Sequence, residues 1–200
     1  MREKLRVSLP VIVEGKYDKN TLSQILDATI LTTDGFAIFN SKEKQALLRR
    51  LCSDGAIVLT DSDGGGTQIR AFLSSLLPKE SIHSLYIPKI QGKERRKSAP
   101  SKSGTLGVEG MEADLLYELF LPLSDGHEKK KGPPVTKTDF FVCGLTGAEN
   151  ASIRRDALAL SLRLPDGMGA TPLLCAVNLL LSREEFFACV QALFPDTEVL

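Results

Sequence analysis

Short β-branched runs alternate with segments of helical periodicity over the first ninety residues of this chain. The runs predict four strands, at 10–15, 28–35, 57–60 and 82–88. Helical patterns of about ten residues separate these strands. Because this alternation is typical of βα units, the sequence predicts an α/β fold with a mostly parallel sheet covered by helices on both faces.

The predicted helices are defined by their apolar positions and their caps. The first helix is expected to bury one apolar face, formed by Leu22, Ile25 and Leu26. The second is expected to begin at a capping box and to carry a leucine face, the residues being Asn40, Glu43, Leu47, Leu48 and Leu51. The third has the clearest periodicity and is expected to end at Pro78, after Ile69, Phe72, Leu73, Leu76 and Leu77.

The second half of the chain predicts helices without strands. One helix is expected at 113–121, and a charged stretch with two prolines then indicates a linker. The later helices are expected at 150–164, after Thr171 as N-cap with Pro172 at the first helical position, and after Ser182 with Glu185 as a capping box. The predicted organisation is a domain at 1–122, a linker at 123–137 and a small all-helical domain at 138–200.

Composition limits the classes of function. The chain has 200 residues, 42% of them hydrophobic, which is enough for a globular core. Its 25 basic residues equal its 25 acidic residues, so any binding of nucleic acid must come from a local patch. The four cysteines have neither zinc-site spacing nor a disulfide framework, and no run approaches the length of a membrane span. We therefore expect a cytoplasmic protein with no membrane attachment.

Acidic residues follow two of the predicted strands, in EG at 14–15 and DSDGGG at 61–66. Ligands of open parallel sheets bind at the carboxyl ends of the strands. If the two strands are neighbours, Glu14, Asp61 and Asp63 meet at one edge, and their mutual repulsion favours a cation. Hard carboxylate oxygens suit Mg²⁺, which can also accept phosphate oxygens of a substrate.

Other interpretations of these acids are structural. Glu14 alone is more often a turn or cap residue, Asp18 is expected to cap a helix, and Asp61 with Asp63 could cap the third helix. An EF-hand beginning at Asp61 fails, because Gly65 and Phe72 stand where ligands are required. A phosphatase with Asp61 as nucleophile stays as a weak competitor.

A basic segment could supply the phosphate contacts that the neutral chain as a whole does not. Residues 89–104 carry six basic residues and only Glu94 as an acid, between serines, prolines and glycines. Its candidate RNA contacts are Arg95, Arg96 and Lys97; a solvated loop is the alternative. Lys16, directly after the first strand's glycine, is a further candidate phosphate contact.

The sequence resembles the Toprim domain, in which a glutamate closes the first strand and an acidic DxD pair closes the third. VIVEGKYD, TTDG, IVLTDSDGGG and GVEG together resemble the ribonuclease M5 family, and CGLTG and NLLLSREEF resemble its helical domain more loosely. The chain departs from the family's common pattern at Lys16, Tyr17 and Ser62, so a paralogue acting on another RNA is an alternative.

The resemblance implies a Toprim catalytic domain that matures 5S ribosomal RNA by cutting its precursor with one or two Mg²⁺ ions. It also implies a partner, the ribosomal protein that binds this RNA. Carried over, Glu14, Asp61 and Asp63 match the acidic triad, and Glu109 an additional acid. Gly66 matches the glycine after the triad and is expected to let the substrate backbone come close. Metal-assisted phosphodiester hydrolysis is the expected chemistry, with Glu14 as ligand or general acid or base. The alternative to an enzyme is a noncatalytic RNA-binding or ribosome-assembly module that keeps the Toprim fold.

Overall fold

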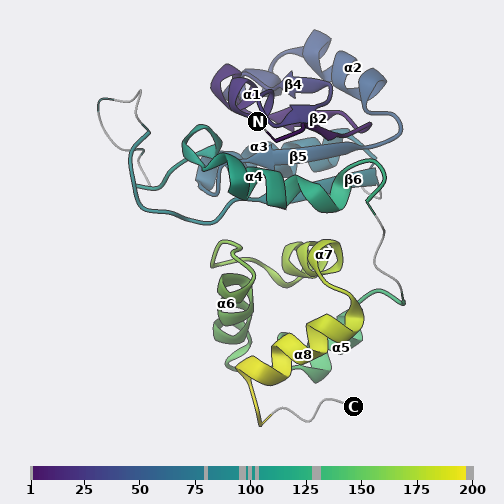
Figure 1. Ribbon diagram of the computed structural model, residues 1–200, viewed down its shortest axis with the longest axis vertical. Helices are drawn as coiled ribbons and strands as arrows, with labels where there is room; N and C mark the ends of the chain where they lie inside the picture. The colour runs from purple at the N-terminus through teal and green to yellow at the C-terminus, as the bar shows by residue number, and fades with distance from the viewer. Residues whose placement is uncertain are drawn as a thin grey trace. The chain divides into compact units, whose positions relative to one another are not determined.

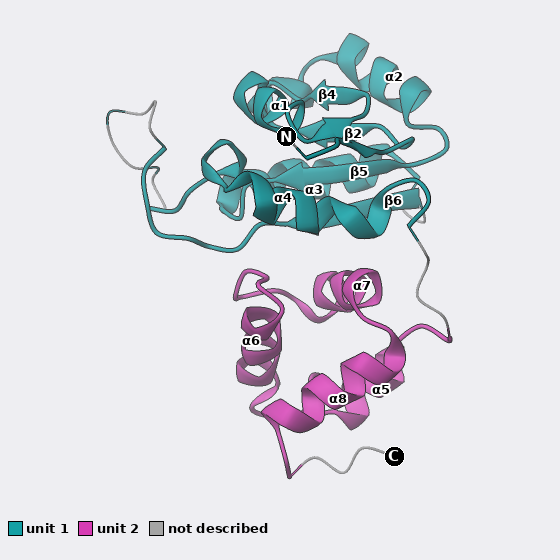
Figure 2. Cartoon of the chain, in the orientation of Figure 1, with its two compact units in different colours: residues 1–127 teal, residues 128–200 magenta. Residues whose placement is uncertain are grey.

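The computed structural model describes residues 2–78, 81–94, 98, 101, 104–127 and 132–196. It divides into two compact units, residues 1–127 and 128–200 (Figure 2). The first unit contains every strand of the described residues: β1 (Leu5–Arg6), β2 (Val11–Val13), β3 (Leu26–Asp27), β4 (Ile30–Thr32), β5 (Ala56–Thr60) and β6 (Ile82–Tyr86). Its helices are α1 (Lys16–Leu22), η1 (Gly35–Phe39), α2 (Lys42–Leu51), α3 (Gly64–Leu76), η3 (Val108–Gly110), α4 (Ala113–Phe120) and η4 (Leu121–Leu123).

The main sheet has four strands in the order β4-β2-β5-β6, and every pairing in it is parallel. All five residues of β5 are buried, as a strand covered on both faces requires. Figure 1 shows α4 in front of the sheet and α3 behind it. The prediction of a parallel sheet flanked by helices is therefore confirmed.

The helices α2 and α3 pack against one face of the sheet. Ile69, Leu73 and Leu77 are buried in the same cluster as Ile12 and Val58 of the sheet, so the apolar face predicted for the third helix is confirmed. The central strands β2 and β5 are buried, and each is hydrogen-bonded to a strand on both sides. The loops at their carboxyl ends therefore begin at well-defined positions. These loops carry the candidate site.

Three details of the predicted first unit are wrong. The first helix ends at Leu22, and Leu26 instead pairs with Leu5 in a separate two-stranded parallel sheet of β1 and β3. Ser41, not Asn40, is the N-cap of α2, and its hydroxyl accepts the N–H of Lys44. Leu47 and Leu51 are exposed. Consecutive helical residues are about 100° apart, so the stripe of Leu48 and Cys52 that faces the sheet turns its neighbours outward.

The second unit is helical. It consists of α5 (Lys137–Val142), α6 (Ala151–Ser161), α7 (Ala170–Leu180) and α8 (Arg183–Leu193). The capping box of Ser182 and Glu185 is confirmed at the start of α8. The predicted N-cap Thr171 is wrong, because Gly169 is the N-cap of α7 and places Pro172 in the first turn, where proline is tolerated.

The unit is tied together by a buried carboxylate. Asp139 of α5 accepts hydrogen bonds from the guanidinium of Arg183, at 2.7 and 3.2 Å, and from Thr136. The rings of Phe140 and Phe186 stack in the core of the unit. None of the described helices, in either unit, is long and apolar enough to cross a bilayer.

Candidate active site

Glu14 and Asp61 lie just after β2 and β5, which are neighbouring strands of the main sheet. β2 pairs directly with β5, so the segment after Val13 and the segment after Thr60 emerge side by side. Oε1 of Glu14 accepts a hydrogen bond from the backbone N–H of Asp61 at 2.9 Å. The structure thus brings together the two acids that the sequence placed 47 residues apart.

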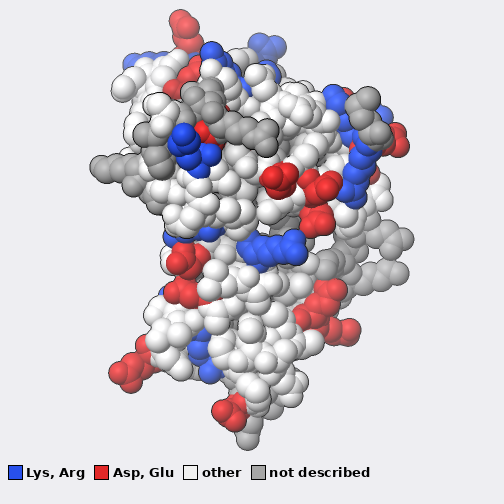
Figure 3. All heavy atoms as spheres, turned by 60° about the vertical axis from the view of Figure 1, so that its left-hand side comes forward, with Lys and Arg blue, Asp and Glu red and all other residues white. Residues whose placement is uncertain are grey.

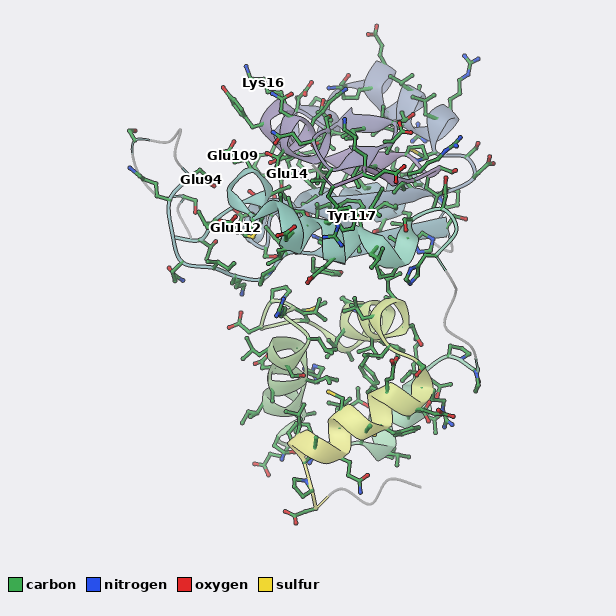
Figure 4. All side chains as sticks on the ribbon, in the orientation of Figure 1. Glu14, Lys16, Glu94, Glu109, Glu112 and Tyr117 are labelled. Atoms are coloured by element: carbon green, nitrogen blue, oxygen red, sulfur yellow. The ribbon has the colours of Figure 1, made fainter. Side chains whose placement is uncertain are left out.

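Asp61 also links this edge to a third segment of the chain. Its Oδ1 accepts the N–H of Val108, the first residue of η3, at 2.9 Å. The next residue is Glu109, the additional acid carried over from the family pattern. Figure 4 shows Glu14 and Glu109 on the same side of the first unit, near α1.

Asp63 has the capping role considered for the DSDG segment. It is the N-cap of α3, and its Oδ1 accepts the N–H of Gly66 at 2.8 Å. Asp61 does not share this role, because its carboxylate points to η3 instead. A carboxylate has two oxygens and about four acceptor positions, so capping through one oxygen does not prevent the other from binding a cation.

Asp18 belongs to the same cluster, although the sequence suggested only a helix cap. Its Oδ2 accepts the N–H of Gly15 at 3.0 Å, and the residue is only 9% exposed. Burial, with additional repulsion from Asp61 and Glu109, raises the pKa of Asp18 to about 6. A signal for this role was present, since Asp18 lies in the first turn of the helix that follows Glu14 and Gly15.

The cluster is electrostatically strained without a cation. Burial, followed by repulsion from Asp61, Asp63 and Asp18, raises the pKa of Glu14 to about 7. The hydrogen bond from the N–H of Asp61 opposes this shift but does not cancel it. Several carboxylates are therefore held closer together than their charges favour. The space-filling view shows acidic side chains gathered on one face of the upper part of the molecule (Figure 3).

Two glycines allow the chain to approach these carboxylates closely. A Cβ atom on Gly66 would overlap the carbonyl oxygen of Asp61 and would lie 2.9 Å from Oε1 of Glu14. A Cβ on Gly107 would lie 2.6 Å from Oδ2 of Asp61. Gly66 is therefore needed to pack the start of α3 against the acids; its predicted contact with substrate stays a prediction.

Among the described residues, no group of three or more Asp, Glu, His or Cys side chains is placed so that it could hold a metal ion without side-chain movement. The hydrogen bonds explain this in part. One oxygen of each of four carboxylates accepts a backbone N–H, the residues being Glu14, Asp18, Asp61 and Asp63. The donor set is nevertheless what Mg²⁺ prefers, and a cation would offset the burial and the repulsion that together raise the pKa of Glu14.

A half-buried arginine next to the end of β5 was not anticipated from the sequence. Arg70 of α3 donates to the carbonyl of Leu85 at 2.8 Å and to Oγ1 of Thr60 at 2.6 Å, and its guanidinium lies 3.9 Å from the ring centroid of Tyr86. Its charge also interacts with that of Glu14. The hydroxyl of Ser62, two residues after β5, donates a hydrogen bond to the carbonyl of Ile87 at 2.6 Å.

The predicted basic contacts are only partly visible. Lys16 is exposed at the start of α1, where its ammonium lies 5.1 Å from the ring centroid of Tyr17 (Figure 4). Arg95, Arg96 and Lys97 lie outside the described residues. Of the neighbouring basic residues, Lys93 is described, and its ammonium donates to the carbonyl of Ser98 at 3.4 Å. The roles assigned to these basic residues stay predictions.

Comparison with known proteins gives a consistent set of relatives. No family model matches the chain. Ribonuclease M5 of Clostridium acetobutylicum is 30% identical over 183 residues, which cover 90% of this chain and 91% of that protein. Ribonuclease M5 of Lactiplantibacillus plantarum is 30% identical over 150 residues, covering 74% and 75%. A ribonuclease M5 of Ligilactobacillus salivarius is 29% identical over 167 residues, covering 81% and 80%.

Proposed function

Because the chain belongs to the ribonuclease M5 family, we propose that it is an endoribonuclease that matures 5S ribosomal RNA, with Mg²⁺ bound at the acidic cluster. The observation that carries the proposal is the convergence of Glu14, Asp18, Asp61 and Asp63 at the carboxyl edge of the parallel sheet. The noncatalytic alternative offers no reason for holding carboxylates in such repulsion.

The residues proposed to hold Mg²⁺ are Glu14, Asp61 and Asp63, and a second ion would use Asp18 and Glu109 together with Asp61. Each of these three acids has one oxygen that accepts a backbone N–H, which leaves the other oxygen as the proposed ligand. When bound, Mg²⁺ would stabilise negative charge that develops on the phosphate and activate a water molecule for attack.

The chain's own groups would orient the RNA and move protons. With a pKa of about 7, Glu14 exchanges a proton near neutral pH, which suits a general acid or base when it is not a ligand. The helix α3 begins directly after Asp63, and the N-terminus of a helix favours an anionic phosphate. Lys16 is proposed to contact a phosphate next to the cut.

RNA binding beyond the acids is proposed to use residues 89–104. The segment's excess of basic residues would offset the repulsion between the acidic cluster and the RNA backbone. The ribosomal protein that binds 5S RNA is proposed as a partner that presents the RNA in a folded form. A cytoplasmic location is proposed, in which Cys52, Cys143, Cys175 and Cys189, all of them thiols here, would stay reduced.

The central experiment combines cleavage and metal binding. Labelled 5S precursor RNA would be incubated with the protein, with and without Mg²⁺ and the ribosomal protein. Asp61→Asn should abolish cutting and weaken Mn²⁺ binding, followed by electron paramagnetic resonance, while leaving RNA affinity near that of the parent protein. Asn can still accept the N–H of Val108, so the fold should persist.

Asp54→Asn is the matched control, because Asp54 is exposed just before β5, at the opposite end of that strand. Cutting by Asp61→Asn at the parent rate would exclude the mechanism. A covalent phosphate on Asp61, detected by mass spectrometry, would instead favour the phosphatase alternative.

A further inference from the structure

An aromatic ring lies exposed at the edge of the sheet that carries the acids. Phe36 of η1 is 53% exposed. One face of its ring stacks on Phe39, with centroids 5.5 Å apart and planes 21° apart. Phe39 in turn meets Phe72 edge to face at 4.9 Å, and both of these residues pack against the core. The ring of Phe36 is thus supported from one side and open to solvent on the other.

The backbone places this ring next to the catalytic acids. Gly35, the residue before Phe36, donates its N–H to the carbonyl of Glu14 at 3.0 Å. A Cβ built on Gly65 would lie 3.6 Å from Cζ of Phe36 and 3.3 Å from Oδ1 of Asp63. The tip of the ring and the carboxylate of Asp63 therefore border the same position, and Gly65 leaves that position without a side chain.

The turn that presents the ring is held by several polar contacts. Asp34 and Gly35 both have left-handed backbone, with φ of 55° and 61°. The carboxylate of Asp34 accepts the hydroxyl of Thr32 at 2.8 Å and forms an ion pair with Lys44. The hydroxyl of Thr33 donates to the carbonyl of Glu14 at 3.3 Å. The position of Phe36 is therefore set before any ligand binds.

Exposure by itself is a weak argument, since single apolar side chains are common on protein surfaces. Phe141 of the helical unit, for example, is 64% exposed. Phe36 differs in its neighbours. Its supported ring borders an acidic site for phosphate chemistry, and the adjacent Gly64 leaves open space, since a Cβ there would meet nothing within 4 Å.

Resting on the function proposed above, we infer that Phe36 stacks against an unpaired nucleobase next to the phosphate that is cut. Single-stranded and extruded bases are recognised by stacking on aromatic rings, whereas a base inside a duplex has no open face. The protein would thereby prefer RNA with a bulged or opened nucleotide at the cut. The face of Phe36 not covered by Phe39 is the surface that receives the base.

The test uses hairpin stems taken from the 5S precursor, in which a single 2-aminopurine is moved along both strands. In one series it is unpaired, and in the matched series it faces uridine. Fluorescence and affinity would be measured with full-length Asp61→Asn protein, and cutting with protein that retains Asp61. In both backgrounds Phe36 would be kept or replaced by Leu or Trp. Phe141→Leu is the control for loss of an exposed ring elsewhere.

With Phe36 present, one unpaired position should be strongly quenched on binding. Phe36→Leu should lose this quenching and bind that RNA about 10-fold more weakly, within the range for one stacked base. Its affinity for fully paired stems should not change, and Phe36→Trp should restore both signals. Phe141→Leu should behave like its parent protein.

The inference is overturned if Phe36→Leu matches its parent at every position, or if it weakens paired and unpaired RNA equally, which would indicate a structural role only. Failure of the proposed function has a different signature. In that case the protein with all its acids would leave the 5S precursor intact at every metal concentration, whatever the fluorescence shows.

Discussion

Replacing Glu14 with glutamine is expected to stabilise the first unit at pH 8 when no divalent cation is present. The acid carries its charge in a partly buried position beside other carboxylates, and this raises its pKa from 4.5 to about 7. Glutamine has nearly the same shape, and its Oε1 can still accept the N–H of Asp61. The substitution therefore removes the cost of a buried charge and its repulsion from neighbouring carboxylates, and it keeps the hydrogen bond.

The magnitude follows from the shift in pKa. A difference of about 2.5 units corresponds to roughly 3 kcal/mol between the charged and protonated forms. Because the side chain is only partly buried, solvent screening reduces the expected gain to about 1 to 2 kcal/mol. A gain in the free energy of unfolding is unusual for a single substitution, because most substitutions destabilise a protein.

The dependence on pH has a definite sign. The folded state binds the proton of Glu14 more tightly than the unfolded chain does, since the folded pKa is the higher one. Its favourable contribution is complete below about pH 4.5 and is lost as the pH rises through 7. The advantage of Glu14→Gln should therefore be absent at pH 4 and full at pH 8.

The chain offers a selective probe for this measurement. It has no tryptophan, and its three tyrosines, at 17, 86 and 117, all lie in the first unit. Urea unfolding followed by tyrosine fluorescence in EDTA thus reports on the unit that holds the site. Glu3→Gln, at an exposed position of the same unit, is the matched control.

Addition of Mg²⁺ should stabilise the parent protein more than Glu14→Gln and so reduce or reverse the difference. A Glu14→Gln protein that is no more stable than the parent at pH 8 in EDTA would refute the reasoning, because burial and the neighbouring carboxylates would then not disfavour the charged form of Glu14 in the folded state.

Two further predictions concern backbone packing and the helical unit. Gly66→Ala should destabilise the first unit by a few kcal/mol and abolish cutting, because its Cβ would overlap the carbonyl of Asp61, whereas Gly64→Ala should fold normally; thermal unfolding and cleavage rates compare them. Asp139→Asn should destabilise the helical unit by about 1 kcal/mol at pH 7, because Arg183 lowers the pKa of Asp139 to about 2. This contribution is present above about pH 4 and lost as the pH falls through 2, so circular dichroism melts of Asp139→Asn and its parent should converge in acid; a constant difference would contradict the assignment.

Much of the fold could be predicted because its signals are local. The short apolar runs of β2 and β5 are buried along their whole length, and α3 repeats its apolar residues over successive turns. β1 and β3 were missed because two residues are too few to form a pattern. Their pairing depends on contacts between residues 21 apart in the chain.

The candidate site could be predicted as far as strand ends determine it. Glu14, Asp61 and Asp63 follow directly from the position of acids after parallel strands. Asp18 was underrated because a helix cap explains it locally, and its repulsion with Glu109 arises only when α1 meets η3. Arg70 could not have been found, because nothing in a helical repeat reveals which polar residue turns inward to meet a neighbouring strand.

The three-segment connection at Asp61 has a consequence for the order of events during synthesis. Asp61 is hydrogen-bonded to Glu14, 47 residues earlier in the chain, and to Val108, 47 residues later. Contacts of such long range form only after large loops have closed. A nascent chain that has not yet released Val108 from the ribosome cannot complete this connection. The acids at this edge can therefore reach their final arrangement only after the chain as far as Val108 has left the ribosome.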